Sequence, residues 1–157
     1  MLIQELNWFK MIEEFIAYTK LADTKVMDVF SSIDKNLPDA ERLFSHILNA
    51  QHIWANRIVG LKPVFEVWQE HDKHNFQAIS KNNFTLIESC LDNLSLETLV
   101  LYYDSRGNEH KNTIGTMFMQ MLNHSTYHRG QIVSMLKAAG IEPPATDYIL
   151  FKRNNLL

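Results

Sequence analysis

The feature that most constrains the fold is the spacing of apolar residues near the start of the chain. These residues follow one another in alternating steps of four and three, with one threonine in the series: Trp8, Ile12, Phe15, Thr19, Ala22, Val26, Val29 and Ile33. That alternation places the side chains on one face of an α-helix, along a seam of about four heptads. A solitary coiled coil is the competing interpretation. The later segments are too irregular for it, so the seam predicts a helix that packs against neighbouring helices.

A second helix is predicted to begin at the Asn36-Leu37-Pro38-Asp39 segment. Proline in a first helical turn, followed by acidic residues, is a start signal. We expect this helix to run to about Val59, where Gly60 provides a stop. Residues 61–70 contain Pro63 and several apolar side chains, and they are predicted to form a loop packed across one end of the bundle.

Two further helices are predicted, at about 71–91 and 113–139. Between them, residues 98–103 are β-prone and residues 105–108 favour a turn, which indicates a short hairpin-like insertion before the last helix. We expect residues 147–154 to form a tail. The chain is therefore predicted to be all-α: one domain, 1–157, built as a four-helix bundle with a hairpin-like insertion.

Two histidines in the last predicted helix, His124 and His128, are four residues apart. This spacing puts both imidazoles on one helix face, one turn apart. Measured from Met121 at about 100° per residue, they lie near −20° (His128) and −60° (His124), toward the other helices. Burying two imidazoles is costly unless something pairs with them, and a divalent metal is an obvious partner. Because such a pair also arises by chance, a third ligand from another helix is needed to strengthen the prediction.

The other histidines differ in their helical phase. His46 lies at the border of the apolar face of the second predicted helix, whereas His52 points away from that face and is expected at the surface. His71 and His74 are three residues apart and form a possible metal pair, but no apolar seam surrounds them, so we expect both to be surface residues.

Composition excludes some function classes. The net charge of −3 gives no general attraction to nucleic acid or to an anionic membrane. The one cysteine, Cys90, fits a small core residue in a reducing compartment. We see no signal peptide and no long apolar span, and we expect a cytoplasmic protein. No P-loop, GxSxG, CxxC or HExxH occurs, and the absence of Glu-x-x-His argues against a ferritin-like di-iron bundle.

Two segments resemble motifs of the DinB/YfiT-like superfamily. The run from Leu43 to Leu48, followed by Trp54, Arg57 and Gly60, resembles the family's second-helix motif, and Asn123 to Ile132 is similar to its last-helix motif. Gly140, Pro143-Pro144 and Asp147-Tyr148 follow as in the family's tail. The resemblance implies an up-down-down-up bundle, commonly a homodimer, that binds one divalent metal ion (zinc, nickel, iron or manganese). Its three histidine ligands map onto His46, His124 and His128.

Four polar residues are candidates for contacts with a substrate or with the ligands. Gln120 and Gln131 lie beside His124 on the last predicted helix, and Asn49 is near enough in pattern to line a cavity. Arg129 lies on the opposite flank, where it either holds an anionic substrate or pairs with a carboxylate. The alternative for each of them is that it is an ordinary polar or structural residue with no part in a site.

Two classes of function remain. The first is a metal-dependent enzyme acting on a small molecule, for which the resemblance implies thiol S-transfer or hydrolysis. The second is a metal-binding or stress-response protein without turnover. We also predict a homodimer, because Trp8, Phe9, Met11, Phe15 and Ile16 give the first helix a wide apolar arc.

Overall fold

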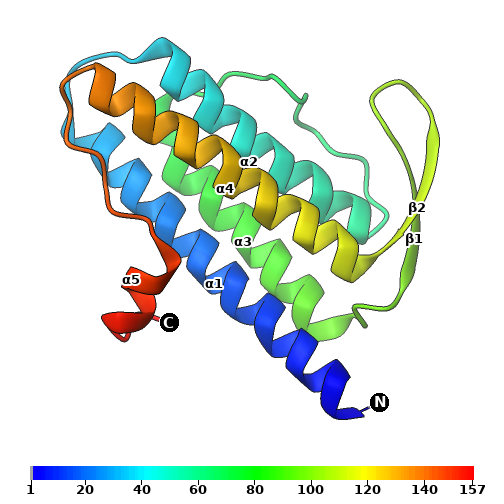
Figure 1. The fold of residues 1–157 in the computed structure, drawn as a ribbon. Helices are drawn as coiled ribbons and strands as arrows, with labels where there is room; N and C mark the ends of the chain where they lie inside the picture. The colour runs from blue at the N-terminus through cyan, green and yellow to red at the C-terminus, as the bar shows by residue number, and fades with distance from the viewer. Residues whose placement is uncertain (1) are drawn as a thin grey trace.

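Four long helices form the body of the molecule in the computed structural model, which describes residues 2–157 and the side chains from residue 7 onward. They are α1 (Leu2–Ser32), α2 (Pro38–Ile58), α3 (Phe76–Asn93) and α4 (Ile114–Ala138). Figure 1 shows α2 and α3 running in one direction while α1 and α4 run in the other. The arrangement is the predicted four-helix bundle with an up-down-down-up connection.

The connection between α2 and α3 returns along the length of the bundle (Figure 1). It ends in a short 3-10 helix, η1 (Lys73–Asn75), at which the Asp72 side chain accepts a hydrogen bond from the backbone N–H of His74. The predictions of a loop across one end and of a helix from residue 71 are therefore wrong. Two parallel neighbouring helices require a long crossover, and the crossover uses the residues before Phe76.

The predicted insertion is a hairpin of β1 (Leu99–Tyr103) and β2 (Glu109–Thr113). The strands are antiparallel, and their register pairs Leu99 with Thr113. Gly107 takes a positive φ of 82° in the turn, a conformation that favours glycine. The hairpin leads directly into α4, whose first turn is capped by the side chain of Thr113. It thereby fixes the start of the helix that carries His124 and His128.

Two large apolar clusters make up most of the core, with a polar layer between them, and a third, smaller cluster lies around Tyr18, Ala22 and Phe151. One large cluster includes Ile12, Phe84 and Phe118, and the other includes Phe30 and Phe44. On α1, α2 and α4, the residues between the clusters are buried and polar: Asp23, Gln51, Ser125 and Arg129. The predicted seam on α1 lies in this core, and Cys90 is a buried core residue as expected.

The C-terminal segment forms a short helix, α5 (Tyr148–Arg153), where the sequence predicts only a tail. Its Tyr148 ring stacks on Phe15 at 5.1 Å, and Phe151 is buried against α1. Part of the apolar arc from which a dimer is predicted is thus covered by the chain itself, and Ile16 lies in the core. Met11 stays 44% exposed.

Among the described residues, no helix is both long and apolar enough to cross a membrane.

Candidate metal centre

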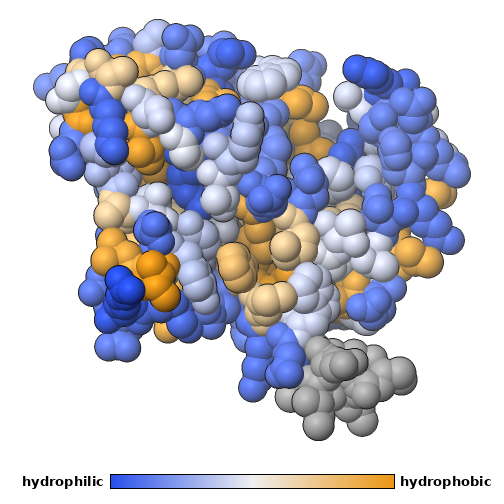
Figure 2. All heavy atoms as spheres, viewed as in Figure 1, coloured by the Kyte–Doolittle hydropathy of each residue, from blue (hydrophilic) through white to orange (hydrophobic). Residues whose placement is uncertain are grey.

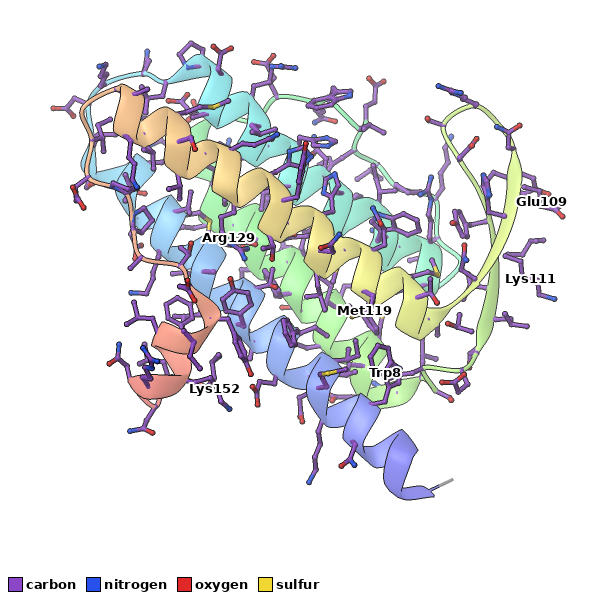
Figure 3. All side chains as sticks on the ribbon, in the orientation of Figure 1. Trp8, Glu109, Lys111, Met119, Arg129 and Lys152 are labelled. Carbon is purple, nitrogen blue, oxygen red and sulfur yellow. The ribbon has the colours of Figure 1, made fainter. Side chains whose placement is uncertain are left out.

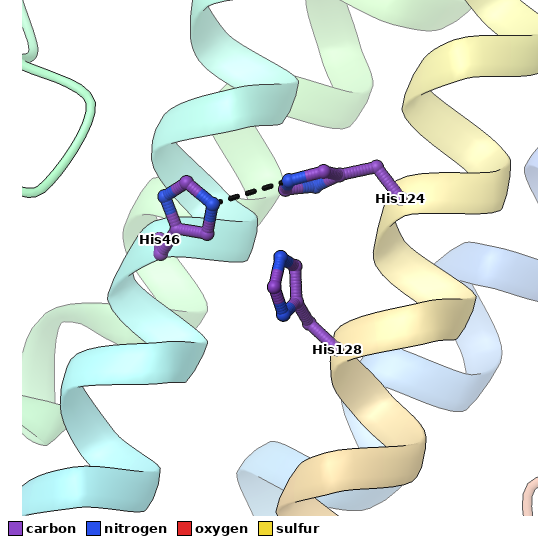
Figure 4. Close-up of side chains that lie close together, drawn as sticks. All are labelled: His46, His124 and His128. Atoms are coloured by element: carbon purple, nitrogen blue, oxygen red, sulfur yellow. Dashed lines mark hydrogen bonds between the residues drawn. The ribbon is translucent and has the colours of Figure 1, made fainter.

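Three histidines converge where α2 and α4 pack together. His46 comes from α2, and His124 and His128 come from successive turns of α4 (Figure 4). Their nitrogen ligand atoms all lie within 4.8 Å of one another. In the part of the chain that the structure describes, this is the only cluster of three or more histidine, cysteine or acidic residues with metal-binding spacing. These are the same three histidines that the sequence resemblance identifies as metal ligands.

Hydrogen bonds on the far side of two of the rings fix their tautomers. Nδ1 of His46 donates to the carbonyl oxygen of Val67 at 2.8 Å, and Nδ1 of His128 donates to Oε1 of Gln131 at 2.7 Å. Because these nitrogens carry the protons, the Nε2 atoms of both rings present lone pairs. A carbonyl or amide oxygen on the second imidazole nitrogen is the usual support of a metal-ligating histidine.

Within the described part of the chain, the third ring, His124, lacks a hydrogen-bond partner on one of its two nitrogens. Its Nε2 lies 3.1 Å from Nε2 of His46, while its buried Nδ1 has no hydrogen-bond partner among the described residues. In tetrahedral zinc sites, Zn–N bonds of about 2.0–2.1 Å place neighbouring nitrogens about 3.3 Å apart. The spacing of this pair and the all-imidazole donor set therefore suit a divalent transition-metal ion.

Burial favours the neutral form of His124 and His46, which is the form that coordinates metals. Desolvation, together with the neighbouring His128 and His46, lowers the pKa of His124 to about 4. Desolvation also lowers the pKa of His46, although its hydrogen bond to Val67 acts in the opposite direction. Both rings are consequently neutral at pH 7.

The crossover loop covers one side of the cluster. The Trp68 indole stacks on the His46 ring, with the ring centroids 3.8 Å apart and the planes within 9° of each other. Asn49 on α2 holds this loop, because its amide nitrogen donates to the carbonyl of Gln69 at 2.7 Å. Its oxygen accepts from Nε2 of His71, also at 2.7 Å. Asn49 therefore holds in place the loop that carries Trp68.

His52 and His71 are partly buried, and are not the simple surface residues predicted for His52 from helical phase and for His71 from the lack of an apolar seam. The His52 ring accepts a hydrogen bond from the backbone N–H of Val64 at 3.1 Å, and Phe65 lies against both rings. Desolvation lowers the pKa of each imidazole. The phase argument for His52 failed because it did not include the crossover loop, which packs on the outward side of that residue.

The remaining candidate residues separate into different environments. Gln131 contacts His128 directly. Gln120 lies on the wall of a smaller cavity of about 280 Å³, together with Trp54 and Tyr102. Arg129 lies between α4 and α1 (Figure 3), where it donates to Asp23. Of the four polar candidates, only Gln131 touches a ligand histidine.

Arg129 pairs with a carboxylate, the second of the two alternatives that the sequence leaves open. Its Nη1 donates to Oδ1 of Asp23 at 2.8 Å, and the two side chains are 2% and 0% exposed. Gln51 donates to the other carboxylate oxygen at 2.7 Å. Burial raises the pKa of Asp23, while the charge of Arg129 opposes that rise. This pair ties α1 to the turn of α4 next to His128.

A larger open cavity of about 620 Å³ lies beside the cluster, with His128 and Gln131 on its wall. Trp68 and Arg42 also line it. Sequence reasoning missed both residues. The available signal for Arg42 was its position one helical turn before His46.

Comparison with known proteins shows the family to which this chain belongs. The model of the DinB family matches residues 4–155. The chain belongs to the DinB family. A stretch of 41 residues is also 44% identical to Protein DinB of Bacillus subtilis (strain 168). That stretch covers 26% of this chain and 24% of the relative, so the local match spans about a quarter of the relative's length.

Proposed function

We propose that this DinB-family protein is a metal-dependent enzyme that acts on a small molecule. The ion, which is zinc, nickel, iron or manganese, is held by His46, His124 and His128. The observation that supports an enzyme is the cavity of about 620 Å³ that reaches the cluster at His128. Three protein ligands beside an open cavity are typical of catalytic sites, whereas structural zinc sites have four.

The residues around the three histidines have separate roles in this proposal. Val67 and Gln131 hold two of the imidazoles in the tautomer that presents Nε2. Trp68 covers His46 and excludes water from that side. A bound divalent ion supplies Lewis acidity, which favours the deprotonation of a thiol or water at neutral pH. The reactions that fit are S-transfer from a small thiol to an electrophile and hydrolysis.

The test compares metal-free protein with protein reloaded with zinc, nickel, iron or manganese. A panel of small thiols is assayed with 1-chloro-2,4-dinitrobenzene as the electrophile, and a panel of ester and amide substrates tests hydrolysis. We expect turnover that requires metal and that is lost in His124→Ala. Metal-loaded protein without turnover on either panel would favour a non-catalytic metal-binding or stress-response role.

Two further properties are proposed with this function. We propose a homodimer, since members of the family are commonly dimeric and Met11 leaves apolar surface on α1. We also propose a reducing, cytoplasmic location, which fits a single buried thiol at Cys90.

A further inference from the structure

The cavity beside the candidate metal centre is lined by both polar and apolar side chains. The polar lining includes His128 and Gln131, and the apolar lining includes Leu43, Met135 and Ala138. Figure 2 shows hydrophobic side chains gathered over the C-terminal end of α4 on this side of the molecule. A volume of about 620 Å³ lies within the usual range of small-molecule sites. The cavity is thus suited to a ligand with an apolar body.

Arg42 supplies a positive charge at this cavity. It lies four residues before His46 on α2, so the two side chains project from the same helix face about 5–6 Å apart at Cβ. Its guanidinium lies 5.1 Å from the centre of the Trp68 ring, and that same ring stacks on His46. The contact with the indole orients the guanidinium beside the cluster.

The guanidinium of Arg42 forms no ion pair with any of the described carboxylates. Arg129, by comparison, is paired with Asp23. Asp39 also lines the cavity but makes no ion pair with Arg42. The donors of Arg42 are therefore available to a ligand, and a guanidinium matches the geometry of a carboxylate.

We propose that this cavity binds a small organic carboxylate, with the carboxylate on Arg42 and the apolar body against Leu43 and Met135. This inference rests on the proposed function, because it assigns the cavity as the substrate site of the metal centre. Since Arg42 and His46 are one turn apart, the carboxylate lies about one helical turn from the reacting end of the ligand. Asp39 repels the carboxylate and so favours its placement at Arg42.

The test uses two ligands of nearly equal shape, 4-phenylbutyrate and its neutral amide, 4-phenylbutanamide. Their dissociation constants are measured by isothermal titration calorimetry on the full chain in buffer containing zinc. The measured quantity is the ratio of the amide constant to the carboxylate constant. Any attraction of zinc for the carboxylate is common to all variants, so a change in this ratio isolates the side chain that was changed.

We expect Arg42→Gln to lower this ratio about fivefold, the effect of an ion pair at a solvent-accessible site. Arg42→Lys retains part of the preference, and Asp39→Asn raises the ratio. The matched control is Arg106→Gln, in the exposed hairpin turn, which leaves the ratio unchanged. An unchanged ratio in Arg42→Gln would overturn the proposal, as would the failure of both ligands to bind.

Failure of the proposed function gives a different result. Zinc content per protomer, measured on the same samples, tests whether the histidines hold an ion. If the protein retains no zinc but Arg42→Gln still lowers the ratio about fivefold, the proposal of a metal-dependent enzyme is refuted, whereas the carboxylate site is supported.

Discussion

Replacing Asp23 by alanine should destabilise the protein more than any change to its exposed ion pairs. The substitution removes a carboxylate that accepts from Arg129 at 2.8 Å and from Gln51 at 2.7 Å. It leaves a guanidinium that is 2% exposed, with the Thr126 hydroxyl at 3.1 Å as its remaining hydrogen-bonded partner among the described residues. Breaking a buried pair in this way costs about 3–5 kcal/mol.

The expected shift in melting temperature follows from the length of the chain. An unfolding entropy of about 2.1 cal/mol/K per residue gives roughly 0.33 kcal/mol/K for a chain of this size. A loss of about 4 kcal/mol therefore lowers Tm by about 12 °C. The measurement is urea and thermal unfolding followed by circular dichroism, with the slope of the urea transition used to check that unfolding stays two-state.

Two further variants provide the controls. Glu88→Ala breaks the pair between Lys20 and Glu88, whose side chains are 48% and 45% exposed, and it should cost less than about 1 kcal/mol. The double variant Asp23→Leu/Arg129→Met removes both buried charges and should be more stable than Asp23→Ala alone. If Asp23→Ala costs no more than Glu88→Ala, the buried pair does not hold α1 to α4 as inferred.

Three other predictions concern the metal centre and its surroundings. Gln131→Leu should weaken metal affinity about 10- to 100-fold, because the His128 ring loses its orienting acceptor; unchanged affinity in a metal titration would contradict this role. Burial lowers the pKa of His52, so the folded state favours the neutral ring. The contribution of this neutral ring to the stability of the fold is present above about pH 6.5 and is lost as the pH falls. The protection factor of the Val64 amide, which donates to that ring, should therefore fall between pH 7 and 5 once the pH dependence of the intrinsic exchange rate is taken into account; the same fall in His52→Phe would refute the link. Light scattering should give about twice the chain mass of 18.3 kDa, and a result at the chain mass itself would count against a dimer.

The helical architecture was predictable because it follows from local rules. The spacing from Trp8 to Ile33 predicts a helix packed by its neighbours, and α1 covers nearly all of that range. The β-prone segment before the last helix predicts the hairpin, which occurs at Leu99–Tyr103 and Glu109–Thr113. Proline, glycine and apolar periodicity act within a few residues, so they are visible in a sequence.

The surroundings of the histidines were less predictable because they depend on tertiary contacts. The position of Trp68 on His46 depends on a crossover loop that has no periodicity of its own. The partner of Arg129 is more than 100 residues away on α1, and helical phase gave only the flank on which Arg129 lies. Phase places a side chain relative to its own helix, whereas the element that covers it is set by the packing of the whole chain.

The most direct test of the central claim is the metal content of seven single variants, each with one histidine replaced by alanine. The protein is purified without nickel resin and dialysed, and metal per protomer is measured by mass spectrometry. We expect the ion to be lost or greatly reduced in three variants: His46→Ala, His124→Ala and His128→Ala. The other four should keep it, at His52, His71, His74 and His110. Full occupancy in His46→Ala, or no effect in any of the seven, would contradict a three-histidine metal site between α2 and α4.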